Sequence, residues 1–92
     1  MNLEGKVAYI TGGTKGIGYG IAECLLKEGM KVAISGRSQE GVDWAVKNLG
    51  DGERVLGIIS DVTKLKDEIA AVDKILATWG QLDMVMANAG VG

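Results

Sequence analysis

The sequence predicts an α/β fold in which parallel strands alternate with covering helices. Three observations support this prediction: four short apolar runs, three intervening segments whose apolar residues fall at helical spacing, and 15 glycines without a proline among 92 residues. Parallel strands require crossover connections of a dozen or more residues, which the helical segments provide. Right-handed crossovers then predict half of a doubly wound parallel sheet, with four strands in the order 3-2-1-4 and three helices. Residues 1–92 are expected to form one domain.

The first strand and the first helix flank a glycine-rich segment. Residues 7–10 form a short apolar run typical of a buried strand, and helical spacing begins at Ile17 and continues to Lys27. Gly29 is placed to end this helix. The residues that we expect on its inward face are Ile17, Ile21, Cys24 and Leu25. Cys24 is accordingly predicted to be a small buried residue.

A second strand is predicted at residues 32–34, and Ser38 is placed to cap the helix that follows. Glycines at 50 and 52 end that helix. Its expected inward residues are Val42, Ala45, Val46 and Leu49. A third strand is predicted at residues 54–59.

The third helix has the clearest apolar pattern of the chain. Thr63 is its expected N-cap and Gly80 its expected end. Apolar residues at alternating steps of four and three predict a stripe that faces the core: Leu65, Ile69, Val72, Leu76 and Trp79. A fourth strand at residues 82–87 follows.

Composition and charge exclude several classes of function. The net charge is -2, from ten basic and twelve acidic residues, so the chain has no basic field with which to bind nucleic acid. With no histidine and one cysteine, neither a zinc site nor an internal disulfide is expected, and no metal site is predicted. The first apolar run is too short for a signal peptide or a membrane span. We therefore expect a cytoplasmic protein that does not bind membranes.

The glycines between the first strand and the first helix predict a phosphate site. Gly12, Gly16 and Gly18 lie where the free amides of a helix N-terminus begin. Glycine allows a turn with positive φ and leaves no β-carbon between the loop and a pyrophosphate. The six-residue GxGxxG pattern would need Gly or Ala at Ile21, and a P-loop would need Lys at Tyr19. Phosphate binding by a differently spaced loop is favoured over an ATPase site and over a plain turn.

The segment Thr11-Gly12-Gly13-Thr14-Lys15-Gly16-Ile17-Gly18 resembles the cofactor loop of the short-chain dehydrogenase/reductase family. Asp61-Val62 is similar to the family's acidic residue that contacts adenine, and Asn88-Ala89-Gly90 resembles its Asn-Asn-Ala-Gly motif, with Ala87 in place of the first Asn. The resemblance covers the whole chain. It implies a Rossmann-type sheet and hydride transfer between a nicotinamide cofactor and a small carbonyl or alcohol substrate. The cofactor-binding residues that it implies are Gly12, Thr14, Lys15, Gly16, Ile17, Gly18, Asp61, Val62, Asn88, Ala89 and Gly90.

Two of these residues also have structural interpretations. Asp61 can form an Asx turn ahead of the expected cap at Thr63, and this role can coexist with cofactor contact. Asn88 can tie strands together through backbone contacts instead of touching the cofactor.

The residue after the second strand distinguishes the two nicotinamide cofactors. A carboxylate there accepts the ribose hydroxyls of NAD and repels a 2′-phosphate. Gly36-Arg37-Ser38 has no carboxylate and offers a guanidinium and a hydroxyl, both of which suit a phosphate. Lys15 can add a second positive charge. We therefore predict that Arg37 and Ser38 bind NADP(H), with NAD(H) as the alternative.

The family's catalytic residues, a Ser and a Tyr-x-x-x-Lys pair, lie by resemblance beyond the Asn-Ala-Gly segment. Tyr9 and Tyr19 are followed four residues later by Gly13 and Glu23, so neither forms the pair. No catalytic residue is predicted. The chain by itself is expected to be inactive, a cofactor-binding portion truncated before the catalytic region.

The fourth strand is expected to leave an apolar edge, Met84-Val85-Met86, without a covering strand. We expect this edge to pair with a second copy of the chain or with a missing C-terminal half. A fragment of a longer reductase, a natural truncation and a half-domain that pairs with another chain remain open. The alternative functions are a non-catalytic nucleotide-binding or strand-pairing module and a methyl-donor-binding domain, which Gly36-Arg37 disfavours because such a domain usually has an acid there.

Overall fold

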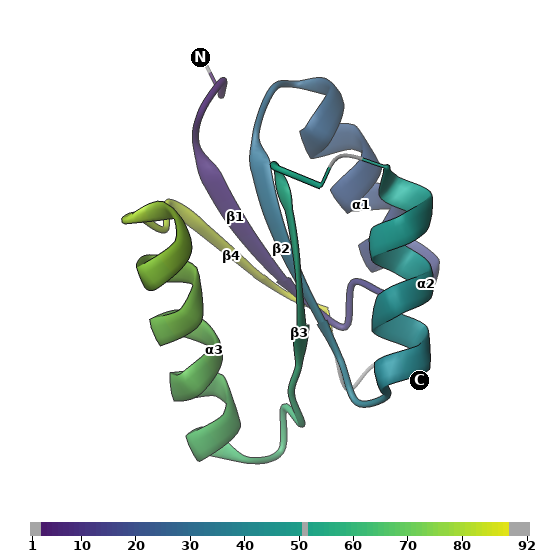
Figure 1. The fold of residues 1–92 in the computed structure, drawn as a ribbon, viewed down its shortest axis with the longest axis vertical. Helices are drawn as coiled ribbons and strands as arrows, with labels where there is room; N and C mark the ends of the chain where they lie inside the picture. The colour runs from purple at the N-terminus through teal and green to yellow at the C-terminus, as the bar shows by residue number, and fades with distance from the viewer. Residues whose placement is uncertain (1–2, 51, 89–92) are drawn as a thin grey trace.

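The computed structural model describes residues 3–50 and 52–88 as a four-stranded sheet with helices on both faces (Figure 1). The strands are β1 (Val7–Thr11), β2 (Lys31–Gly36), β3 (Val55–Ile59) and β4 (Met84–Ala87). The helices are α1 (Gly16–Lys27), α2 (Gln39–Leu49) and α3 (Leu65–Trp79). The predicted alternation of strands and helices is confirmed, with β2 longer and β4 shorter than expected.

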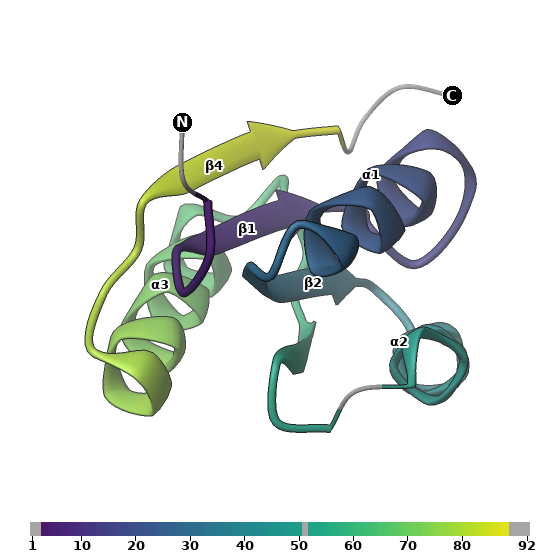
Figure 2. The same ribbon diagram turned by 90° about the horizontal axis from the view of Figure 1, so that it is seen from above.

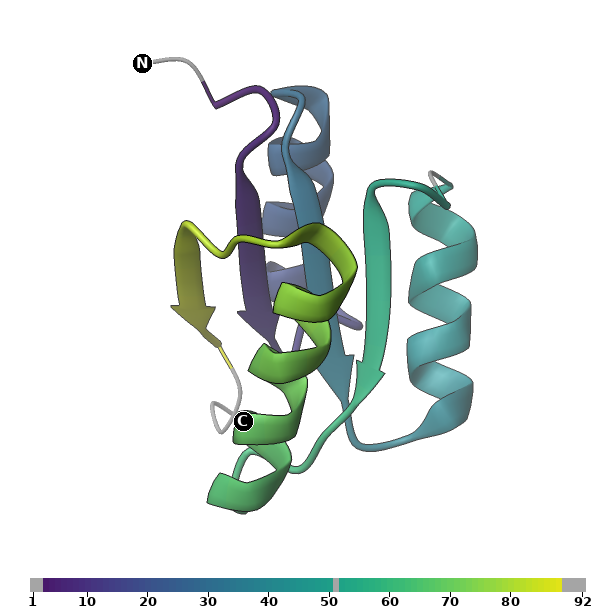
Figure 3. The ribbon, with the colours of Figure 1, turned by 60° about the vertical axis from the view of Figure 1, so that its left-hand side comes forward.

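All three strand pairs are parallel, and the strand order is β3-β2-β1-β4, as predicted. The register pairs Tyr9 of β1 with Ala33 on one side and with Val85 on the other. Helices α1 and α2 cover one face of the sheet, and α3 covers the opposite face (Figures 2 and 3). The chain therefore winds in one direction from β1 to β3 and in the other from β3 to β4. Because all four strands are parallel, their carboxyl ends lie at one edge of the sheet, and the reversal falls between β1 and β4.

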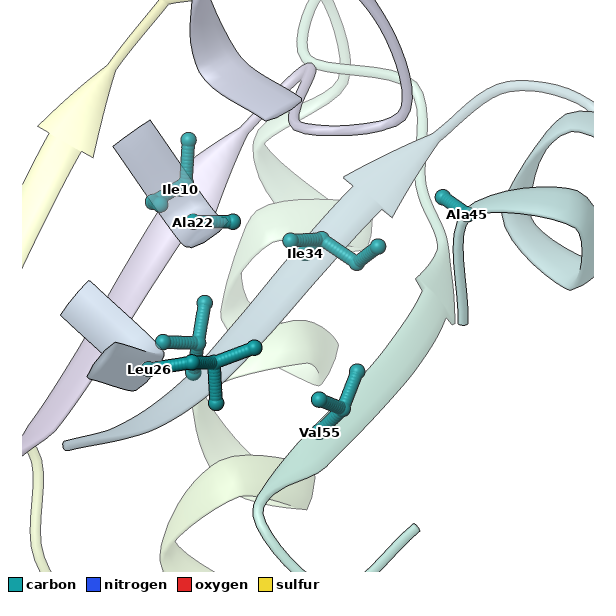
Figure 4. Close-up of a cluster of buried hydrophobic side chains, with 7 residues drawn as sticks. Ile10, Ala22, Leu26, Ile34, Ala45 and Val55 are labelled. Carbon is teal, nitrogen blue, oxygen red and sulfur yellow. The ribbon is translucent and has the colours of Figure 1, made fainter. Parts of the chain in front are cut away.

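Strand β1 is buried along its whole length because helices cover both of its faces. Its side chains alternate between two apolar cores. Ile10 belongs to the core under α1 and α2, which Figure 4 shows, together with Ala22, Leu26, Val32, Ile34, Ala45 and Val55. The core under α3 contains Val7, Tyr9, Ala33, Ile58, Ala71 and Ile75.

Helix α2 has the cap and the inward face that the sequence predicts. The Ser38 side chain accepts a hydrogen bond from the Gly41 amide at 3.0 Å. Val42 and Ala45 are buried, and Val46 and Leu49 are half-buried against the core.

The predicted inward face of α1 is wrong at two of its four positions. Ile17 and Cys24 are exposed, and the buried residues of α1 are Gly18, Ala22 and Leu26. These three also fall at helical spacing, but two of them are small. Small side chains let the helix approach the sheet closely, so the face with Gly18 and Ala22 is turned inward. Cys24 is therefore not the buried residue that we expected.

The predicted start of α3 is also wrong, and its predicted inward face is wrong at three of five positions. Lys64, not Thr63, is the N-cap, because the amide and the hydroxyl of Thr63 both donate to the Asp61 carboxylate. Ala71 and Ile75 are buried against the sheet, and Val72 and Trp79 are half-buried. Leu65, Ile69 and Leu76 of the expected stripe are exposed, at 76, 54 and 43%. We call these three residues the outer α3 stripe.

Within residues 3–50 and 52–88, every helix is too short or too polar to cross a lipid bilayer. In the same part of the chain, no group of three or more His, Cys, Asp or Glu side chains is placed to hold a metal ion.

Candidate functional site

The predicted site residues within the described ranges lie in the connections that follow the four strands. Residues 12–15 connect β1 to α1, Arg37 and Ser38 follow β2, Asp61 and Val62 follow β3, and Asn88 follows β4. Because the strands are parallel, all of these connections lie at the carboxyl edge of the sheet (Figure 3). This edge is where open α/β sheets bind ligands, at the point where the winding direction reverses. Ala89 and Gly90 of the predicted site lie outside the described residues.

The glycine loop has a conformation that requires glycine at two positions. Gly12 and Gly16 have φ angles of 69° and 64°, which lie in the left-handed region that other residues rarely adopt. These turns carry the chain from the end of β1 directly into α1. The predicted requirement for glycine in this loop therefore has a local conformational cause.

The first turn of α1 has free backbone donors. No described group accepts a hydrogen bond from the amides of Gly16, Ile17 or Gly18, and the first bond of the helix runs from the Tyr19 amide to the Lys15 carbonyl at 3.4 Å. Lys15, the N-cap residue, provides no side-chain cap, and the first turn has no acidic residue. These amides and the positive end of the helix dipole are therefore available to an anion.

Gly18 packs directly against the glycine loop and the end of β4. A β-carbon at this position would lie 2.7 Å from Asn88 Nδ2, 2.9 Å from the Gly12 carbonyl oxygen and 3.1 Å from Gly13 Cα. Two of these neighbours are backbone atoms, which cannot turn aside as a long side chain can. The absence of a side chain at Gly18 thus lets the β1 loop, the start of α1 and the end of β4 meet.

Asn88 is held against the loop by the last residue of β1. Its amide donates to Thr11 Oγ1 at 3.0 Å, and the Thr11 hydroxyl donates to the Met86 carbonyl at 3.4 Å. Thr11 is buried. The bond from the Asn88 amide to Thr11 supports the structural interpretation of Asn88 as a tie between strands. The Asn88 side chain also reaches the glycine loop.

The connection after β3 is an Asx turn. Oδ1 of Asp61 accepts from the Thr63 amide at 2.9 Å and from the Thr63 hydroxyl at 2.6 Å. These two bonds hold the pKa of Asp61 below its usual 3.8, and the nearby cations Lys64 and Arg37 lower it further. The Asp61 amide in turn donates to Asp67 Oδ2 at 2.9 Å. Asp61 is thus an oriented carboxylate, ionised at neutral pH, beside the start of α3.

The lowered pKa of Asp61 predicts that this turn loses stability in acid. A carboxyl group whose pKa is lower in the folded chain stabilises it above the usual value of 3.8, and the effect is lost as pH falls through the lower, folded value. We expect the urea midpoint of wild type to exceed that of Asp61→Asn most at about pH 6 and least at about pH 3. A difference that stays constant over this range would contradict the prediction.

Arg37, Ser38 and Lys15 provide the polar groups beside the loop. Arg37 and Lys15 are exposed, and Arg37 is close enough to Asp61 to affect its pKa. The Ser38 hydroxyl oxygen accepts from Gly41, and its own hydrogen remains available for donation. The structure therefore gathers two cations and a hydroxyl around the carboxyl ends of β1 and β2.

Two contacts between the glycine loop and β2 were not foreseen from the sequence. A β-carbon at Gly13 would lie 2.7 Å from Ile34 Cγ2, and one at Gly36 would lie 2.8 Å from Thr14 Cγ2. The sequence signal was only that these positions are glycines. The partners depend on how the loop lies on the neighbouring strand.

Residues 6–92 match the sequence pattern of the short chain dehydrogenases, which covers nearly the whole chain. The chain belongs to the short-chain dehydrogenase family. The predicted family is thereby confirmed, and the structure confirms the Rossmann-type sheet and its strand order.

Known members of this family show how much of a short-chain dehydrogenase the chain represents. It is 44% identical over 92 residues to oxidoreductase asL5 of Sarocladium schorii, covering 100% of this chain and 36% of that protein. It is 42% identical over 88 residues to tropinone reductase-like 3 of Erythroxylum coca, covering 95% of this chain and 34% of the relative. The chain thus spans about a third of the length of these relatives.

Solved structures of short-chain dehydrogenases have the same fold. A Bacillus anthracis short chain dehydrogenase superposes with a TM-score of 0.91 at 31% identity, over 97% of this chain and 36% of the other. A 3-ketoacyl-(acyl-carrier-protein) reductase from Brucella melitensis, complexed with NADH, gives a TM-score of 0.83 at 38% identity, over 90% and 34%.

Proposed function

We propose that this chain is the NADP(H)-binding portion of a longer oxidoreductase that transfers hydride between a nicotinamide cofactor and a carbonyl or alcohol substrate. The observation that carries the proposal is the row of unpaired amides at Gly16, Ile17 and Gly18, which begins α1 directly after the glycine loop at the carboxyl edge of the sheet. The names of the relatives, such as oxidoreductase asL5 and tropinone reductase-like 3, support an oxidoreductase activity. When bound, the nicotinamide would supply the hydride or accept it.

Each predicted residue has a role that its position permits. The amides of the first turn of α1 would bind the pyrophosphate, since they are free and lie at the positive end of the helix. The exposed side chain of Ile17 offers an apolar contact beside them. Asp61 and Val62 would lie against the adenine end, and Asn88 would hold β4 against the loop.

The preference for NADP(H) over NAD(H) is supported by charge. Gly36 ends β2 without a carboxylate, and Arg37 follows as an exposed guanidinium. A guanidinium can bind a 2′-phosphate with two parallel hydrogen bonds, and Ser38 and Lys15 add a donor and a second cation. We place this chemistry in the cytosol, a reducing compartment, since the one cysteine of the 92 residues, Cys24, cannot form a disulfide within them.

Arg37→Asp tests the cofactor preference. In the full-length protein that contains this chain, we expect the Kd for NADPH to rise by roughly 100-fold, because a charged hydrogen bond is replaced by repulsion. The Kd for NADH should change less than about threefold, since NADH lacks the 2′-phosphate. Isothermal titration with each cofactor measures both values.

Lys47→Asp is the matched control for Arg37→Asp, because it makes the same change in charge in the last turn of α2, away from the loop. It should alter neither Kd. Equal losses of NADPH and NADH affinity in Arg37→Asp would contradict the assignment of the 2′-phosphate to Arg37. Failure of the wild-type protein to bind either cofactor would contradict the proposed function.

We also propose that the sheet continues beyond β4 in the longer protein. Val85 of β4 is 57% exposed, and β4 pairs on one side only among the described strands. A further parallel strand beside β4 would need a right-handed crossover that moves in the same direction as β3 to β4. Its helix would therefore lie on the face that α3 covers, against the outer α3 stripe. Pairing of this edge with a second copy of the chain is the alternative.

A further inference from the structure

Position 36 ends β2, where a carboxylate would bind the ribose hydroxyls of NAD. Gly36 does not have a positive φ, so its backbone conformation does not require glycine. Glycine is required because the neighbouring side chains leave no space for a β-carbon at this position. A β-carbon at this position would lie 2.8 Å from Thr14 Cγ2, 3.2 Å from Thr14 Oγ1 and 3.3 Å from Val42 Cγ2.

The backbone at Gly36 is also fixed from the other side. It pairs with Ile59 in the ladder between β2 and β3, and its carbonyl accepts from the Ser60 amide at 2.9 Å. The strand end therefore cannot move away from Thr14 without breaking a bond to the neighbouring strand. Thr14 is held in turn by its own loop, in which Gly13 packs directly on Ile34.

From this contact we infer that Thr14 is a specificity-determining residue, because its side chain fills the space that an acidic residue at position 36 would need. The inference rests on the proposed dinucleotide site. With position 36 kept free of a side chain, Arg37 is the first side chain after β2 that can reach a cofactor. Thr14 then acts by exclusion at position 36, whether or not it touches the cofactor itself.

A double-mutant cycle tests this inference in the full-length protein. Gly36→Asp alone should lower the melting temperature of the cofactor-free protein by about 5 °C, because its β-carbon meets Thr14. Thr14→Ala removes the two nearer of the three atoms that this β-carbon meets and leaves Val42 Cγ2 at 3.3 Å, so Thr14→Ala/Gly36→Asp should recover most of that loss. The double variant should also bind NADH at least tenfold more tightly than Gly36→Asp does, and NADPH far more weakly than wild type does, because the new carboxylate repels a 2′-phosphate.

Thr14→Val/Gly36→Asp is the matched control, since valine keeps the bulk of threonine, and it should be as unstable as Gly36→Asp. If Gly36→Asp does not fold, the milder pair Gly36→Ala and Thr14→Ala/Gly36→Ala measures the same coupling in melting temperature. The inference is overturned if alanine at position 14 restores no stability, or if Gly36→Asp alone binds NADH as well as the double variant does. A third outcome separates the inference from the proposed function. If positions 14 and 36 are coupled in melting temperature but wild type binds neither cofactor, the steric contact is supported, and both the proposed function and the specificity role of Thr14 are refuted.

Discussion

Replacing Gly18 by alanine is expected to destabilise the protein by about 2 kcal/mol and to weaken dinucleotide binding at least tenfold. The added β-carbon would lie 2.9 Å from the Gly12 carbonyl oxygen and 3.1 Å from Gly13 Cα. To relieve these contacts, α1 must move away from the loop, and its free amides move with it. Urea unfolding and titration with NADPH in the full-length protein measure the two effects.

Gly20→Ala is a matched control for Gly18→Ala, because it makes the same substitution two residues further along α1. A β-carbon at Gly20 would meet nothing within 4 Å. Alanine also favours the helix over glycine, so Gly20→Ala should stabilise the protein by about 0.5–1 kcal/mol without changing cofactor affinity. If the two variants behave alike, the effect comes from helix propensity and not from the packing of the loop.

The strand order and the gathering of the candidate site residues at one edge of the sheet were predictable because they follow from local signals joined by general rules. Each apolar run and each helical segment is visible in the sequence, and right-handed crossovers in a doubly wound sheet give the order 3-2-1-4. Ser38 was predicted correctly as a cap because the signal is a single residue beside the helix that it caps. The carboxyl edge then follows from the parallel arrangement.

The inward faces of α1 and α3 were not predictable, because an apolar stripe does not say what covers it. On α1, Gly18 and Ala22 face the sheet since they allow close approach, whereas the larger Ile17 is exposed. On α3, Ala71 and Ile75 pack on the sheet, whereas the outer α3 stripe, which the sequence predicted to face inward, is exposed. Hydrophobic periodicity favours large apolar residues for the inward face of a helix, but close packing against the sheet can favour small ones.

The polar contacts under α3 could not be predicted because their partners are far apart in the sequence. Glu68 accepts from the Tyr9 hydroxyl at 3.1 Å and from the Ser60 hydroxyl at 2.9 Å. Burial raises the pKa of Tyr9 to about 12, and the Glu68 carboxylate adds to the effect. In the sequence, Glu68 is simply an acidic residue in the first turn of a helix. The contact between Thr14 and Gly36 escaped prediction for the same reason.

Ile75 and Ile69 of α3 lead to a prediction that distinguishes a residue of the core from a residue of the outer α3 stripe. Ile75 is fully buried, so Ile75→Ala should cost about 3 kcal/mol in urea unfolding, in the 92-residue chain and in the full-length protein alike. Ile69 is 54% exposed, so Ile69→Ala should cost less than about 1 kcal/mol in the chain alone. If a further helix covers the outer α3 stripe, the same substitution should cost about 2 kcal/mol or more in the full-length protein. A small cost for Ile69→Ala in both polypeptides would contradict the proposed continuation of the fold on this face. A side chain whose removal costs little stability in the full-length protein is not packed against a further helix.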